Sequence, residues 1–80
     1  MKSAHNQTLQ SALCLNNEGY PASLEVGKLY RVISDDEAAA HGYIRVIDES
    51  GEDYAFTASR FHVIELPLAV GQALLAASRP

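Results

Sequence analysis

The residues best suited to chemistry in this chain are carboxylates, and the densest group of them surrounds a Ser-Gly pair. Its members are Asp48, Glu49, Glu52 and Asp53. Carboxylate oxygens suit a divalent cation, but a calcium loop places its ligands at alternating positions, and this segment lacks that spacing. We therefore expect no metal here. Because like charges beside a turn are destabilising, cationic neighbours are expected, and Arg45 and Arg60 are the candidates.

A second set of carboxylates lies in two predicted loops. Glu18 belongs to the first loop, and Asp35, Asp36 and Glu37 follow one another in the second. Clustered carboxylates can pair with Lys or Arg on a partner and speed its encounter. The alternative is that they are solvated loop charges that keep the protein soluble. The residue types alone leave both interpretations open.

Exposed aromatic side chains are the usual anchors of a small binding domain, and three are candidates here. They are Tyr20, Tyr43 and Phe61. In the alternative, Phe61 packs in the core beneath a short helical turn and only one tyrosine is accessible. The other aromatic residues are predicted to form core or cross-strand pairs, and they are Tyr30, Tyr54 and Phe56.

Nothing in the chain has the pattern of a catalytic centre. No nucleophile motif surrounds a serine, no glycine-rich loop could cradle a phosphate, and His41 and His62 stand far apart in the sequence. The single cysteine, Cys14, lies in an apolar segment that disfavours a thiolate. We expect it to be a small buried hydrophobic residue in a reducing compartment. The sequence predicts a protein that is not an enzyme and binds no cofactor.

The length and net charge of the chain limit the classes of protein to which it could belong. Eighty residues make one domain at most. Six Lys and Arg against ten Asp and Glu give a net charge of −4, which argues against nucleic acid because phosphate neutralisation supplies most of that affinity. No apolar run reaches the ~20 residues of a membrane span, and no secretory signal is visible. The expected location is the cytoplasm.

The hydrophobic pattern predicts a small all-β domain. Alternating apolar residues and turn signals place five strands, at 10–15, 28–33, 43–48, 53–57 and 61–66. Gly51 is expected to reverse a hairpin, and a 3₁₀ turn is expected near 57–60. The segment 34–42 is a loop with at most one helical turn, which Ser34 or Asp35 would cap and Gly42 would end. Residues 1–9 are expected to form a flexible tail.

A helix over 68–78 is expected to end the domain. Pro67 suits the first position of a helix, and Val70 and Leu74 lie four residues apart on one face. Gly71 weakens the helix by about 1 kcal/mol relative to alanine. Because an isolated helix of this length is marginal in water, it must dock on the strands or on another chain.

The order of these elements resembles Src-homology-3 (SH3) domains over about residues 11–66. ALCLN resembles the opening strand of that family, LEVGKLYRVI its diverging turn and second strand, and GYIRVID with GEDYAFTASRFHVIE its remaining strands, hairpin and 3₁₀ turn. The chain is also similar to small, poorly characterised bacterial proteins in which a DESGEDY-type hairpin recurs. The resemblance implies a five-stranded SH3-like barrel, spanning 10–66, with the helix and tail at 67–80.

The same resemblance implies a groove for a polyproline helix. Tyr43 falls near the groove tryptophan of the third strand, and Phe61 near the tyrosine that ends the 3₁₀ turn. Thr57 or Ala58 falls where the family has proline. The two groove tyrosines of the first strand fall on Cys14 and Asn16, which removes much of the aromatic floor and weakens the case for ordinary PxxP recognition. Tyr20 could replace part of that floor.

These observations lead to one functional expectation and two alternatives. The first is a non-enzymatic SH3-like module that binds a basic or proline-containing peptide or protein. Its residues would be Glu18, Tyr20, Asp35, Asp36, Glu37, Tyr43 and Phe61. The second is a structural subunit or homodimer that uses the C-terminal helix. The third, RNA or ribosome association, is disfavoured by the net acidity.

Overall fold

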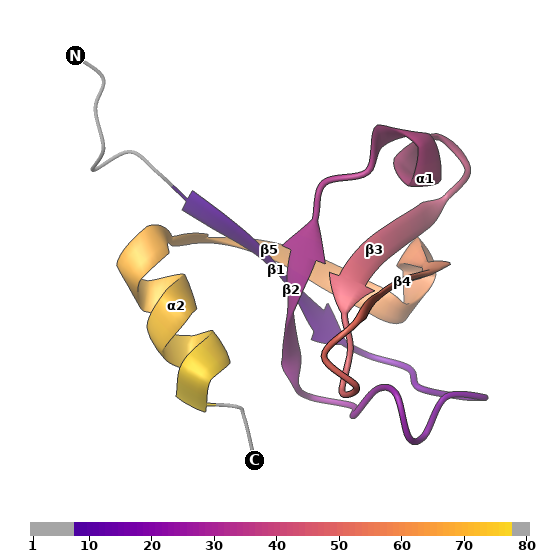
Figure 1. The fold of residues 1–80 in the computed structure, drawn as a ribbon, viewed down its shortest axis with the longest axis horizontal. Coiled ribbons are helices and arrows are strands. Elements are labelled where there is room, and N and C mark those ends of the chain that lie inside the picture. The colour runs from indigo at the N-terminus through magenta and orange to yellow at the C-terminus, as the bar shows by residue number, and fades with distance from the viewer. Residues whose placement is uncertain (1–7, 78–80) are drawn as a thin grey trace.

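A computed structural model describes residues 8–77 and shows a mainly β domain with a short C-terminal helix (Figure 1). Its elements are β1 (Thr8–Cys14), β2 (Leu29–Ile33), α1 (Asp36–Ala40), β3 (Tyr43–Ile47), β4 (Asp53–Thr57), the 3₁₀ turn η2 (Ala58–Arg60), β5 (Phe61–Pro67) and α2 (Leu68–Ala77). The five predicted strands, the hairpin, the 3₁₀ turn and the final helix are all confirmed. β1 begins at Thr8, within the expected tail, whose residues 1–7 lie outside the described part. Pro67 closes β5, whereas the sequence suggested that it would open the helix.

All strand pairs are antiparallel, and the sheet has the order β4-β3-β2-β1-β5. β2 changes partner along its length, because 29–31 pair with β1 whereas 32–33 pair with β3. Phe56 on β4 and Phe61 on β5 come from opposite edges of this strand order, yet their ring centroids are 6.2 Å apart, so the sheet is bent and its two halves enclose the core. Within residues 8–77, the outer strands β4 and β5 are not paired with each other, so the sheet stays open at that side.

The core lies on the inner face of the bent sheet. Its buried members are Ala12, Cys14, Leu24, Tyr30, Val46, Phe56 and Phe61. Phe56 is at the centre of an aromatic cluster, with ring centroids 5.1 Å from Tyr20 and 6.2 Å from Phe61, both in edge-on geometry. Cys14 is fully buried as predicted, and burial raises the pKa of its thiol. The thiol is thus held in its unreactive protonated form.

The helix α2 packs against β1, β2 and β5. Gly71 lies so close to Leu9 that a Cβ atom at Gly71 would be 2.9 Å from Leu9 Cδ2 and 3.1 Å from Leu9 Cβ. The lower helix propensity of this glycine therefore has a packing reason, since a side chain here would require Leu9 to shift. The expectation that the helix docks on the strands is confirmed.

Ser11 on β1 is fully buried, and its Oγ has no hydrogen-bond partner among the described residues. A buried hydroxyl without a partner costs free energy, so we expect Ser11→Ala to leave stability unchanged or raise it by up to about 1 kcal/mol. Ser50→Ala is the matched control, because Ser50 Oγ donates to Asp48 and accepts from the Glu52 N–H. That variant should lose about 1 kcal/mol. Urea midpoints of both variants test this, and an equal loss in the two would contradict it.

Candidate functional site

The short helix α1 is held in place by the carboxylate of Asp35. Asp35 Oδ1 accepts a hydrogen bond from the Ala38 N–H at 3.0 Å, which caps the helix as predicted. Its Oδ2 accepts from Arg45 Nε at 2.8 Å. The Ala38 N–H, followed by the Arg45 guanidinium, holds the pKa of Asp35 below its usual range. Asp35 is therefore charged and engaged within the chain, and its main role in the structure is to position α1.

Arg45 on β3 joins α1 to the acidic hairpin. Besides its contact with Asp35, its Nη1 lies 3.4 Å from Asp53 Oδ2. Arg45 is thus one of the cationic neighbours that the sequence predicted for the hairpin. Arg60, the other candidate, lies elsewhere: its guanidinium is 4.8 Å from the centre of the Tyr20 ring, and it donates to the Asn16 carbonyl at 3.3 Å.

A cleft of about 320 Å³ lies beside α1 and is bordered by residues of β1, β2, β3 and β5; we call it the α1 cleft. Its lining includes Val32, Asp35, Asp36, Tyr43, Ile44 and Val63. Val32 and Ile44 are partly buried and pack against the core, so the floor is apolar. Val63 is 43% exposed and Tyr43 is 44% exposed. The cleft therefore combines an apolar floor, an accessible aromatic ring and an acidic rim.

The structure brings only part of the predicted set together. Asp35, Asp36 and Tyr43 share the α1 cleft, and Glu37 is exposed on α1 next to Asp36. Glu18 and Tyr20 belong to the first loop and do not line this cleft. Tyr20 is 43% exposed, and its ring lies between Phe56 and the Arg60 guanidinium.

Phe61 lies in the core with 7% of its surface exposed. The alternative interpretation, that Phe61 packs in the core beneath the 3₁₀ turn, is therefore confirmed for this residue. Its place on the inner face of the sheet follows from its pairing with Cys14 of β1. That alternative also allowed only one accessible tyrosine, whereas Tyr20 and Tyr43 are both partly exposed. Tyr30 and Phe56 are buried as predicted, and Tyr54 faces solvent at 48% exposure, paired across the strands with Val46.

Sequence reasoning missed the floor of the cleft, namely Val32, Ile44 and Val63. The period of two along each strand could place each of them on the inner face, in step with the buried Tyr30, Val46 and Phe61. Whether an inner-face residue is covered depends on how far the two halves of the sheet close over it, and that depends on contacts distant in sequence.

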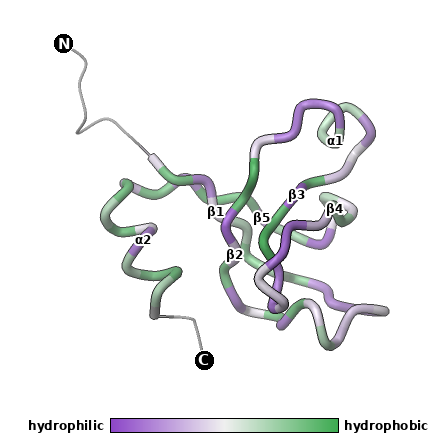
Figure 2. Tube along the Cα trace, in the orientation of Figure 1, coloured by the Kyte–Doolittle hydropathy of each residue, from purple (hydrophilic) through white to green (hydrophobic). Residues whose placement is uncertain are grey.

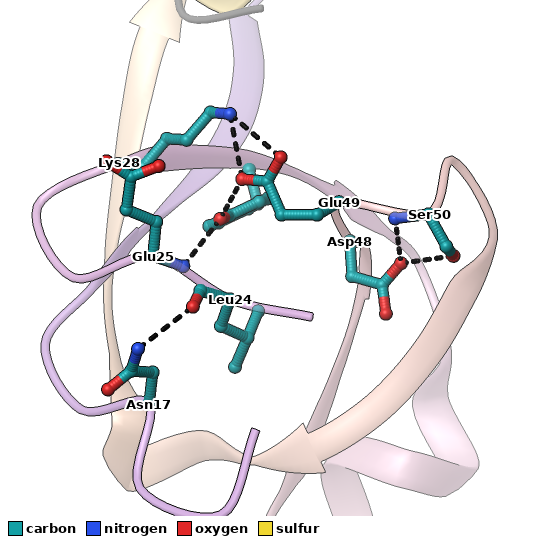
Figure 3. Close-up of polar contacts among 8 residues, drawn as sticks. Asn17, Leu24, Glu25, Lys28, Asp48, Glu49 and Ser50 are labelled. Atoms are coloured by element: carbon teal, nitrogen blue, oxygen red, sulfur yellow. Dashed lines mark hydrogen bonds and ion pairs between the residues drawn. The ribbon is translucent and has the colours of Figure 1, made fainter. Parts of the chain in front are cut away.

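The acidic hairpin around Ser50 is held by hydrogen bonds among its own residues. Asp48 is 6% exposed, and its Oδ1 accepts from the N–H and Oγ of Ser50 (Figure 3). Among residues 8–77, no group of three or more His, Cys, Asp or Glu side chains is arranged to hold a metal ion.

Glu49 forms a second polar network, which sequence reasoning also missed. Lys28 Nζ lies 2.7 Å from Glu49 Oε2 (Figure 3). The Tyr30 hydroxyl donates to the same oxygen. The Tyr30 oxygen in turn accepts from the Glu25 N–H at 2.8 Å. Lys28, followed by Tyr30, holds the pKa of Glu49 below its usual range, while burial and then the Glu49 carboxylate raise the pKa of Tyr30. Lys28, Tyr30 and Glu49 thus interact with one another within the chain, and together they hold the turn before β2 against the end of β3.

Among the described helices, none combines the length and apolar character that a membrane crossing requires. Comparison of the chain with protein-family models, with curated proteins and with solved structures finds no match in any of the three. Any inference about function must therefore start from the chain's own residues, and the α1 cleft is one surface on which apolar side chains, an exposed aromatic ring and charge meet.

Proposed function

We propose that this protein is a non-enzymatic interaction domain of the SH3-like type, which binds an extended segment of a partner protein in the α1 cleft. The observation that carries the proposal is the exposed ring of Tyr43 above an apolar floor, beside the carboxylates of Asp36 and Glu37 on α1. An apolar or prolyl side chain of the partner would fill the floor. A neighbouring Lys or Arg would face the acidic rim.

The order of the elements supports the SH3-like type. The elements follow one another in the order that the resemblance implies. They are a first strand, a long loop, a turn into a second strand that changes partner, a hairpin, η2 and a last strand that pairs with β1. Tyr43 begins β3, and the Ala58 N–H of η2 donates to the carbonyl of the preceding Gly42. Tyr43 and η2 thus lie side by side, which fits a groove that both would border.

The size and charge of the cleft support a short ligand and modest affinity. A volume of about 320 Å³ is at the lower end of ligand sites and holds one or two side chains. Because Asp35 is neutralised by Arg45, the charge offered to a partner comes mainly from Asp36 and Glu37, both exposed. Exposed charges act chiefly on the association rate and are screened by salt. Binding should therefore weaken as ionic strength rises.

Tyr43→Ala is expected to weaken binding at least about tenfold, because truncating an aromatic anchor removes more than about 1.4 kcal/mol. The measurement is an amide-shift titration of labelled protein with a pooled library of basic, proline-containing peptides. The best peptide is then titrated into each variant. Tyr54→Ala is the matched control, since Tyr54 is 48% exposed but lies outside the α1 cleft.

Two outcomes would overturn this proposal. The first is equal affinity of the Tyr43→Ala and Tyr54→Ala variants for the selected peptide. The second is a set of shifts that avoids Tyr43, Asp36 and Val63 while the protein binds. A parallel titration with mixed single-stranded RNA tests the competing class, and saturable, salt-dependent shifts with RNA alone would replace the peptide proposal with a nucleic-acid one.

A further inference from the structure

Most of the outward face of α2 is apolar, and within Leu68–Ala77 the one polar side chain is the exposed Gln72, which borders the cavity beside the helix. The apolar residues of this face follow the helical repeat, and all of them are exposed: Ala69, Val70, Ala73 and Leu74. Val70 is 47% exposed and Leu74 is 43% exposed. Figure 2 shows hydrophobic colouring along most of α2. A helix on the surface of a globular domain ordinarily turns a charged or polar face to water, whereas the only polar side chain of α2 within 68–77 is Gln72.

The inward face of the same helix is also apolar. Gly71 packs on Leu9, while Leu68 and Leu75 border a cavity of about 690 Å³ between α2 and the strands. Leu29 and Ile47 form part of the opposite wall. A helix with a single polar side chain, here Gln72 beside the same cavity, is normally buried over most of its surface. In one copy of this chain, α2 is covered on one side only.

The distribution of charge indicates what covers the other side. The helix from Leu68 to Ala77 contains no charged residue, although the chain carries a net charge of −4. The carboxylates instead gather on α1 and on the hairpin around Ser50. Two copies that met through those regions would repel each other. Two copies that met through the side chains of Leu68–Ala77 would bring no charged side chain of this segment into the contact.

We propose that α2 is the contact between two copies of this chain. In a two-fold dimer each copy presents the same patch, so the row formed by Val70 and Leu74 packs against the same row of the other copy. Rows of residues four apart cross at about −50°, and the small side chains of Ala69 and Ala73 permit the usual spacing of about 8–10 Å between helix axes. The contact is self-complementary because both surfaces are uncharged and apolar.

The extent of this contact sets its strength. A helix of ten residues is about 15 Å long. A crossing of two such helices buries less than the roughly 800 Å² per partner of a standard stable interface. The dimer should therefore be reversible and depend on protein concentration.

Sedimentation equilibrium of the full chain tests the proposal, over about 1 µM to about 1 mM, which spans weak to moderate association. The wild-type protein is expected to shift from monomer to dimer within this range. Leu74→Glu should weaken self-association at least about tenfold, because it buries two carboxylates at one interface. Val26→Glu is the matched control, because it introduces the same charge at a residue that is 54% exposed and lies outside α2. It should associate like the wild-type protein.

A wild-type chain that stays monomeric throughout would overturn the proposal, as would a Leu74→Glu variant that dimerises as well as the Val26→Glu control. Thermal melting of both variants shows whether each is folded. Concentration-dependent amide shifts give a second readout, and they should centre on Ala69, Val70, Ala73 and Leu74. Shifts centred on the α1 cleft would place the interface elsewhere. Tyr43→Ala should leave self-association unchanged, so this proposal and the proposed peptide binding can fail independently.

Discussion

Phe56→Ala is expected to lower the free energy of unfolding by about 3–5 kcal/mol, the range for removing a buried aromatic ring. Phe56 is 6% exposed, and its ring meets both Tyr20 from the first loop and Phe61 from β5. The truncation therefore removes contacts that join the two halves of the sheet, and leaves a void between them. A domain of this length has a total stability of about 4–12 kcal/mol, so much of it would be lost.

The measurement is urea denaturation followed by circular dichroism. Tyr54→Ala, two residues away at the hairpin end of β4 and 48% exposed, should change stability by less than about 1 kcal/mol. Phe56→Leu keeps the experiment informative if the alanine variant does not fold, since it should retain part of the packing and lose less. The core assignment of Phe56 would be wrong if its alanine variant and that of Tyr54 had the same urea midpoint.

Glu49→Gln is expected to cost about 1.5–3 kcal/mol near neutral pH, the value of a hydrogen bond to a charged group. Solvent contact favours the lower end, because the Glu49 side chain is 25% exposed. The variant removes the charge that both Lys28 and the Tyr30 hydroxyl contact. The turn before β2 would then lose its strongest connection to the end of β3.

The same network should make the protein sensitive to acid. The pKa of Glu49 in the folded protein lies below its ordinary value, as does the pKa of Asp35. A carboxylate of this kind contributes stability above its unfolded pKa of about 4, and the contribution is lost as the pH falls through the lower folded pKa. Wild-type stability should therefore decline as the pH falls below about 5.

Urea midpoints measured between about pH 7 and about pH 3 test this, and the decline should be shallower in Glu49→Gln. Glu52→Gln is the control: Glu52 is exposed, and its contact is with the Tyr54 hydroxyl on the surface of the hairpin. The Glu52→Gln variant should lose well under 1 kcal/mol of unfolding free energy, and its urea midpoint should change with pH as in the wild-type protein. Identical slopes in wild type and Glu49→Gln would show that the Lys28–Tyr30–Glu49 network does not contribute to acid sensitivity.

The local elements of this protein were determined by the sequence itself. Strands follow from the alternation of side chains, as in β3 and β4, whose hairpin reverses at Gly51 with φ of 86°. The carboxylate of Asp35 and the glycine at 42 mark the start and end of α1, because a side-chain acceptor and a positive φ are local requirements. The burial of Cys14 followed from its apolar neighbours. Each of these features depends on residues that are close together in the chain.

The tertiary structure decided which of these residues meet, and therefore where a site can form. Lys28 and Tyr30 find Glu49 only because β2 bends and changes partner, and no local pattern encodes that bend. Phe61 became a core residue through its register with Cys14 on β1, although its position after the 3₁₀ turn also suited a binding groove. The floor of the α1 cleft and the exposed apolar face of α2 likewise depend on which residues the rest of the chain covers. Side-chain coverage is set by contacts between distant segments, whereas the alternation that forms a strand is set by its neighbours.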